Sequence, residues 1–282
     1  MTDYQNSVHA FCLRILESGD LSVKLEAPNV SVGGALEDAG TVSAIAIDRP
    51  ARSEGLELAS SSKPLPRPGS LSAPLARAEC LARFAHHELM AVELFAWALL
   101  RWPQMPAAMR AGLVGVLAQE QVHCALYVER LAEHGYALSD FALSDYFWKH
   151  TPVIVASPHG PSAFLCAMGL TLEQANLDFT LVYRDGFREA GDESSAEVCQ
   201  LIHDEEIEHV RLAAHWLREL QPDAPSDIER YRRAVPFPLS AARAKGRRFD
   251  RAGRRKAGLS DDFIEYVRTA RSSQEQPGEL ER

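Results

Sequence analysis

The chain lacks the sequence features of membrane proteins, secreted proteins and cysteine-based metal proteins. No run of 18 or more uncharged apolar residues occurs in the 282 residues, so no membrane span is predicted. The N-terminus has neither the basic region nor the apolar region of a secretory signal peptide. The five cysteines are scattered and form no Cys-x-x-Cys pair, which is typical of reduced, buried thiols. These absences predict a cytoplasmic protein with no membrane partner.

The charge is acidic overall but uneven along the chain. A net charge of −9 argues against a general nucleic-acid binder. Residues 230–256, however, contain eleven Lys and Arg residues and a single acidic one, Asp250. This basic segment could bind phosphate or RNA, although a solvated, partly helical arm is the simpler interpretation.

The chain divides into three predicted domains. Residues 1–72 combine a helix within 1–19 with a Pro/Gly/Ser-rich stretch at 27–72, which is interpreted as extended chain packing on the rest of the protein or as a linker. Residues 73–220 hold long helices, and residues 221–282 form a basic, partly helical C-terminal extension. In the extension we predict helices over 226–233 and 261–271, with a frayed end at 272–282.

Four helices of similar length are predicted in the central domain. They run from about 74 to 102, 106 to 134, 162 to 190 and 192 to 220, and each break coincides with a proline or a glycine. Two short turns and one long connection, 136–161, join them. This pattern predicts an all-α fold, a ferritin-like four-helix bundle of two antiparallel helical hairpins with a long crossover, flanked by N- and C-terminal extensions.

One spaced motif occurs twice in these helices. Glu88 is followed 32 residues later by Glu120-x-x-His123, and Glu173 is followed 33 residues later by Glu206-x-x-His209. Residues three apart share a helix face, so each Glu-x-x-His can present a carboxylate and an imidazole together. A Glu from each of two helices and Glu-x-x-His from each of the other two is the ligand set of di-iron and di-manganese bundles.

The helix lengths support this interpretation. In the first hairpin the chain climbs and returns by about 14 residues from Glu88 to Glu120, which brings the two carboxylates to the same height. In the second hairpin the agreement is only approximate. A single Glu-x-x-His usually marks a solvated helix face, but apolar residues surround both copies here. The sequence therefore predicts six metal ligands: Glu88, Glu120, His123, Glu173, Glu206 and His209.

Other polar residues near these positions are weaker candidates. Asp178 could replace Glu173 as a ligand, or could hydrogen-bond a ligating histidine. His203 lies one turn before Glu206, and Tyr127 lies four residues after His123, so both are possible members of an outer shell. Glu93 is five residues from Glu88 and is expected to point elsewhere.

The residues around the motifs resemble a known family. The runs His86-His-Glu-Leu-Met-Ala-Val-Glu, Gln119-Glu-Gln-Val-His, Leu172-Glu-Gln-Ala-Asn-Leu-Asp-Phe and Asp204-Glu-Glu-Ile-Glu-His-Val are similar to those of the ferritin-like family catalogued as domain of unknown function 455. The upstream Asp48-Arg-Pro-Ala-Arg and the downstream Pro236-Phe-Pro also resemble that family. The resemblance covers roughly 45–265 and implies a di-metal ferritin-like bundle with the same six ligands. A more distant resemblance is to di-iron hydroxylases that modify tRNA.

Three functions remain open at this point. The first is an O₂-dependent non-haem di-iron oxidase or hydroxylase, a monomer or dimer that acts with O₂ and an electron donor on a small-molecule or RNA substrate. The second is a metal-binding protein or ferroxidase without an organic substrate. The third is an RNA-binding module with a structural metal site. The O and N donors suit two Fe ions, with Mn or a mixed Fe/Mn pair as alternatives.

Overall fold

The computed structural model describes residues 7–28, 38, 43–60 and 64–271. Helices account for 67% of the chain and strands for 2%, so the protein is all-α as predicted. The chain divides into two compact units, Met1–Thr151 and Pro152–Arg282. Each unit contains one long helical hairpin. The three-domain division drawn from the sequence stays a prediction, and the predicted frayed end lies outside the described residues.

The first unit is built on the hairpin of α3 (Pro74–Arg101) and α4 (Ala107–Glu133). Both helices match their predicted ranges within one residue. Pro74 occupies the first turn of α3, where its missing N–H costs nothing. Gly135 follows α4 with a φ of +82°, a left-handed conformation that glycine adopts without a steric penalty. The two helices pack against each other, and the Cys124 thiol donates to the Ala85 carbonyl at 3.2 Å.

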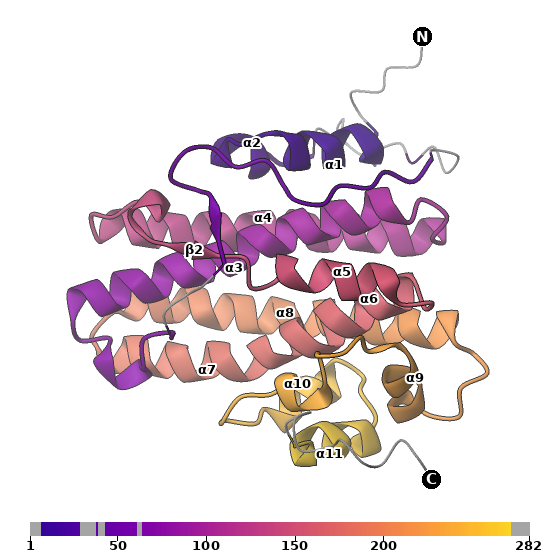
Figure 1. Ribbon diagram of the computed structural model, residues 1–282. Helices are drawn as coiled ribbons and strands as arrows, with labels where there is room; N and C mark the ends of the chain where they lie inside the picture. The colour runs from indigo at the N-terminus through magenta and orange to yellow at the C-terminus, as the bar shows by residue number, and fades with distance from the viewer. Residues whose placement is uncertain (1–6, 29–37, 39–42, 61–63, 272–282) are drawn as a thin grey trace. The chain divides into compact units, whose positions relative to one another are not determined.

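The N-terminal part of this unit covers the hairpin. Helix α1 (Val8–Glu17) packs on α3 and is followed by the short α2 (Leu21–Lys24) (Figure 1). The described part of the following chain hydrogen-bonds to the helices, since the Ala51 amide donates to the Leu16 carbonyl and the Ile45 amide donates to the Leu100 carbonyl. Residues 29–37, 39–42 and 61–63 of the predicted extended segment lie outside the described residues. Two-residue strands β1 (Leu58–Ala59) and β2 (Leu143–Ser144) pair in parallel. The described part of the unit also contains the 3₁₀ turns η2 (Pro68–Ser70), η3 (Leu138–Asp140) and η4 (Trp148–His150).

The second unit is built on a hairpin whose first arm is not a uniform α-helix. After the short α5 (Thr151–Ala156), the predicted helix 162–190 consists of α6 (Pro161–Ala167), the π-helix η5 (Met168–Glu173) and α7 (Gln174–Glu189). The second arm is α8 (Glu193–Leu220), and α7 and α8 pack against each other. The predicted N-cap Asp192 accepts a hydrogen bond from the Ser195 amide at 3.1 Å.

The C-terminal extension packs on this hairpin. It contains α9 (Asp227–Ala234), the 3₁₀ turn η6 (Ala241–Arg243), α10 (Arg251–Lys256) and α11 (Asp261–Thr269) (Figure 1). Ser226 and Ser260 cap α9 and α11, in agreement with the predicted helices. Helix α10 was not predicted, because its basic sequence has no apolar periodicity. It contacts α7 and α8.

Candidate metal centre

The first unit brings together Glu88, Glu120 and His123. Glu88 comes from the middle of α3, while Glu120 and His123 lie one turn apart on α4. One potential ligand atom of each residue lies within 4.8 Å of those of the other two. The His123 imidazole nitrogen Nδ1 is 3.4 Å from a Glu120 carboxylate oxygen. The antiparallel hairpin therefore produces a compact Glu–Glu–His triad, as the equal helix lengths predict.

The second unit brings together Glu173, Glu206 and His209 in the same way. Glu173 ends the π-helix, and Glu206 and His209 lie one turn apart on α8. One potential ligand atom of each again lies within 4.8 Å of the others, and His209 Nδ1 is 3.4 Å from a Glu206 oxygen. The second triad thus repeats the chemistry and spacing of the first.

Glu173 lies at the end of the π-helix. A π-helix bonds residue i to i+5, so it accommodates one more residue per turn than an α-helix. The Gln174 amide makes such a bond to the Gly169 carbonyl. The extra residue of this turn lies before Glu173, outside the interval from Glu173 to Glu206. Single π turns within α-helices are frequent at functional sites.

Both triads fit a hard or intermediate divalent cation. Each offers carboxylate oxygen and imidazole nitrogen and no sulfur, the donor set that Fe and Mn take. The six side chains are at most 5% exposed. Buried carboxylates in like-charged pairs are costly unless a cation offsets their charge. The residues present therefore fit metal ions.

Asn176 is a neighbour of the second triad that sequence reasoning missed. Its side-chain amide donates to a Glu206 carboxylate oxygen at 2.9 Å. A signal existed, because Asn176 is three residues after Glu173 and shares its helix face. The bond fixes the orientation of the Glu206 carboxylate, which is how groups around metal ligands usually act.

Asp178 holds the C-terminal extension. Both of its oxygens accept hydrogen bonds from Arg254, at 2.7 and 3.0 Å. They also accept from the backbone amides of Gly246 and Asp250. The structure thus surrounds Asp178 with donors from the extension.

His203 makes a parallel link between α8 and the extension. Its two ring nitrogens lie 3.1 Å from Asp204 and 3.0 Å from Asp250, the N-cap of α10. Burial lowers the pKa of His203, but the hydrogen bonds to Asp250 and Asp204 outweigh burial, so the pKa lies above its ordinary value. Because both nitrogens face carboxylates, the doubly protonated imidazolium is favoured.

Tyr127 and Glu93 are both buried. The Tyr127 ring packs on Phe84 with 5.3 Å between ring centroids. Glu93 pairs with Lys24 at 2.9 Å and with Arg52 at 2.8 Å, and also accepts from the Trp148 indole N–H at 3.0 Å. Glu93 therefore links α2, the Asp48–Arg52 motif and η4 to α3. Its carboxylate binds these partners, in agreement with the expectation that it points elsewhere than Glu88.

The histidines before Glu88 hold the loop after α4. His86 donates through Nε2 to the Ser144 carbonyl oxygen at 2.7 Å, and His87 stacks on Phe147 with 5.2 Å between centroids. Burial, reinforced by Arg52, lowers the pKa of His86 to about 3. Burial lowers the pKa of His87 to about 4, so both rings are neutral. Burial, reinforced by Glu88, also raises the pKa of the Cys124 thiol, which follows His123 in the sequence.

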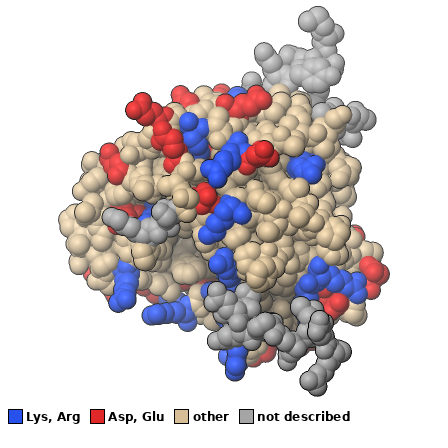
Figure 2. Space-filling model, viewed as in Figure 1, with Lys and Arg blue, Asp and Glu red and all other residues tan. Residues whose placement is uncertain are grey.

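Most of the basic residues of segment 230–256 are paired with carboxylates of the second unit. On the face shown in Figure 2, basic and acidic side chains are interspersed. The pairs are Arg230–Asp227, Arg233–Glu229, Arg248–Asp185, Arg251–Glu265, Arg254–Asp178 and Arg255–Asp261. Six of the eleven basic residues of the segment thus form ion pairs within the second unit.

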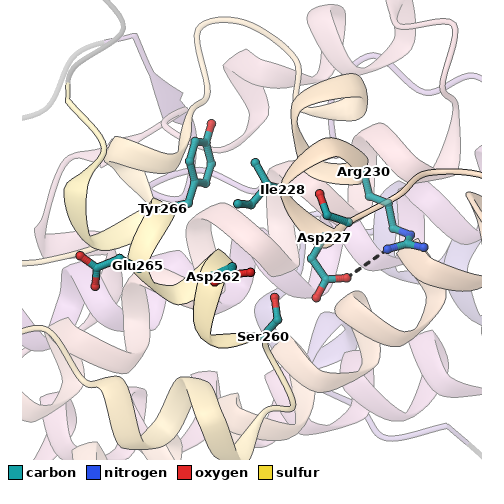
Figure 3. A pocket seen from close by; sticks show the side chains of 8 residues that line it. Asp227, Ile228, Arg230, Ser260, Asp262, Glu265 and Tyr266 are labelled. Atoms are coloured by element: carbon teal, nitrogen blue, oxygen red, sulfur yellow. Dashed lines mark hydrogen bonds and ion pairs between the residues drawn. The ribbon is translucent and has the colours of Figure 1, made fainter.

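The extension also forms an open pocket of about 670 Å³ between α9 and α11. Figure 3 shows Asp227, Arg230, Asp262 and Tyr266 around it, with Asp227 paired to Arg230. Asp227 is also held by Arg218 at 2.7 Å. The Asp227 carboxylate of this pocket is therefore already engaged within the protein.

All five cysteines are buried, and none of them forms a disulfide. Within the described parts of the chain, no helix combines the length and apolar character that a bilayer crossing requires. The fold and the triads together define an all-helical protein with two buried Glu–Glu–His clusters.

Comparison with known proteins places this chain in one family. It belongs to the family described as Protein of unknown function (DUF455), whose model matches residues 19–265. This range includes both triads, the Asp48–Arg52 motif and the extension as far as α11. No curated protein and no solved structure matches the chain.

Proposed function

We propose that the protein is a ferritin-like, O₂-dependent non-haem di-iron oxidase or hydroxylase. The observation that carries this proposal is the pair of matching, buried Glu–Glu–His triads, one in each helical hairpin. In this proposal the two hairpins pack as a four-helix bundle, and the two triads combine into one carboxylate-bridged di-metal centre. The matched Glu-to-Glu intervals and the matched helix lengths support it.

The residues of the chain would divide the work at such a centre. When bound, two Fe ions would supply the redox chemistry that reduces O₂ with electrons from an external donor. Glu120 and Glu206 each share a helix face with a histidine, so each can bind one ion and reach a second. Asn176 holds Glu206 in one orientation. The apolar surroundings exclude water, which strengthens the attraction between carboxylates and cations. Mn, or Fe with Mn, would fit the same donors.

Metal analysis of the protein purified from its native host tests this assignment. Two Fe ions per chain are expected, and Glu120→Ala or His209→Ala should abolish binding. Glu129→Ala is a matched control, because Glu129 is an exposed carboxylate on the same helix as Glu120. Full iron occupancy in the Glu120→Ala variant would contradict the site.

Oxygen uptake separates the oxidase from a ferroxidase. Protein loaded anaerobically with two Fe(II) per chain is expected to consume O₂ once. Further uptake should require an added reductant. A ferroxidase would instead keep consuming O₂ as further Fe(II) is added. A protein that also stored iron would form a large cage, whereas the oxidase proposal expects a monomer or dimer by light scattering.

The RNA-binding alternative depends on the basic segment 230–256. Six of its eleven basic residues pair with carboxylates of the second unit, which weakens the argument for RNA binding. A salt-sensitive affinity for tRNA would restore this alternative, because phosphate contacts release counterions.

A further inference from the structure

The phenol of Tyr231 reaches the π-helix that carries Glu173. Tyr231 lies on α9 in the C-terminal extension and is fully buried. Its hydroxyl oxygen is 2.7 Å from the Thr171 hydroxyl oxygen, and that oxygen is 2.6 Å from the Cys166 carbonyl oxygen. Thr171 is the fourth residue of the π-helix and precedes Glu173 by two.

The direction of these hydrogen bonds follows from their end point. A carbonyl oxygen can only accept, so the single hydroxyl proton of Thr171 is donated to Cys166. The Thr171 oxygen must then accept from Tyr231, whose phenol donates its own proton. Burial raises the pKa of Tyr231 well above its ordinary value, so the phenol keeps that proton. Two hydrogen bonds therefore run in one direction, from Tyr231 on α9 to Thr171 and from Thr171 to the Cys166 carbonyl of α6.

The hydrogen bond from Thr171 to Cys166 requires the geometry of a π-helix. In an α-helix a threonine hydroxyl bonds the carbonyl three or four residues earlier. Thr171 bonds the carbonyl five residues earlier, the spacing of a π-helix. The bond therefore exists only while the extra residue sits at this point of the helix.

Two further contacts fix Tyr231 in place. Its ring packs edge-on against Phe263 of α11, with 5.4 Å between ring centroids. Its backbone carbonyl accepts a weak bond from the Cys166 thiol at 4.0 Å. Tyr231 is therefore fixed by Phe263 at its ring and by Cys166 at its backbone.

We propose that Tyr231 is a positioning residue for Glu173, acting through Thr171. This inference rests on the proposed metal site. A π bulge that moved along the helix past Glu173 would rotate that side chain by about 100°, the angle of one residue in a helix. The Tyr231–Thr171–Cys166 chain pins the bulge before Glu173. The C-terminal extension thus completes the second triad without supplying a ligand.

Metal titration of the purified full-length protein tests the inference. Tyr231→Phe removes the donating hydroxyl and leaves the ring. It is expected to weaken Fe(II) binding at the second triad at least tenfold, so that one ion per chain binds tightly instead of two. Tyr266→Phe is the matched control, because Tyr266 lines the open pocket in Figure 3, 6.5 Å from the Tyr231 ring, and should bind as the wild type does. Wild-type binding of both ions by Tyr231→Phe would overturn the proposal.

A second pair of variants guards against loss of folding. Thr171→Val removes only the hydroxyl and should reproduce the defect, whereas Thr171→Ser keeps the hydroxyl and should restore binding. Equal binding by these two variants would overturn the inference.

Hydrogen exchange of the metal-free protein gives a readout that does not depend on the metal site. Amides 167–174 are expected to exchange faster in Tyr231→Phe and unchanged in Tyr266→Phe. Unchanged protection in Tyr231→Phe would overturn the inference alone. If the wild type bound no metal, the proposed function would fail instead.

Discussion

Asp178 of α7 and Arg254 of α10 form a fully buried, two-pronged ion pair, with nitrogen–oxygen distances of 2.7 and 3.0 Å. The two residues are 76 positions apart in the sequence. Arg254 also donates to the Ala244 carbonyl at 2.8 Å, and its guanidinium lies 3.9 Å from the centroid of the Phe249 ring. This pair attaches α10 to the second hairpin, beside the contact between His203 and Asp250.

Breaking the pair from one side should be severe. Arg254→Met leaves the Asp178 carboxylate buried without its cation, and we expect a loss of about 3–5 kcal/mol in the free energy of unfolding. The double variant Asp178→Asn with Arg254→Met removes both charges and should recover a large part of that loss. Urea denaturation followed by circular dichroism measures both. Equal losses in the single and double variants would contradict this account.

Asp178 also shows where sequence reasoning reached its limit. The sequence placed it near Glu173 and left a choice between ligand and hydrogen-bonding roles. Its partner Arg254 lies in a basic stretch that no local pattern connects to α7, so the pair could not be foreseen. By contrast, the helices and the doubled motif follow from local rules. Proline, glycine and capping residues set the helix ends, and spacing set which side chains share a face.

The π-helix is the second feature that the sequence did not predict. No local pattern in Met168–Glu173 indicates a π-helix. The turn is held by contacts distant in sequence, with Tyr231 on α9 and Ala213 on α8. Local propensity carries no information about such contacts.

Glu93 is predicted to be as sensitive as Asp178. It lies between two buried cations, Lys24 and Arg52, at 2.9 and 2.8 Å. Glu93→Gln keeps the shape but leaves both cations without a carboxylate, so a loss of about 3–5 kcal/mol is expected in urea unfolding. Glu129→Gln, on an exposed position of α4, should change the stability by less than about 0.5 kcal/mol.

Gly169 should tolerate no side chain while Ala213 faces it. A β-carbon at Gly169 would lie 2.3 Å from the Ala213 β-carbon, well inside contact distance. Although alanine normally favours helices over glycine, Gly169→Ala is expected to destabilise the protein by about 1–3 kcal/mol through overpacking. Adding Ala213→Gly should recover most of this loss in thermal unfolding. If the stability changes of the two single variants simply added in the double variant, the two residues would not be in contact.

The stability should fall as the pH rises through the pKa of His203. This pKa is raised in the folded protein, because bonds to Asp250 and Asp204 outweigh the opposing effect of burial. A raised histidine pKa contributes stability that is fully present below the unfolded value of about 6.5 and is lost above the folded value. We expect a loss of about 1 kcal/mol between pH 6 and pH 9 in urea unfolding.

Asp250→Asn is the control for this pH dependence. Asparagine keeps the N-cap of α10 but removes the charge that faces His203. The variant should be less stable than the wild type at pH 6 and should show a flatter profile. A slope as steep as that of the wild type would exclude the His203–Asp250 pair as its source.

Glu120→Gln should have opposite effects on the metal-free and metal-loaded protein. Without metal, Glu88 and Glu120 hold two buried carboxylates whose nearest candidate atoms are within 4.8 Å, an unfavourable pairing of like charges. Removing one charge should therefore raise the melting temperature of metal-free protein. The wild type should gain about 2.7 kcal/mol from Fe(II) or Mn(II) at one hundred times the dissociation constant, and the variant should gain almost nothing. Calorimetry with and without a chelator measures both effects, and a variant that lost stability without metal would argue against the charge pairing.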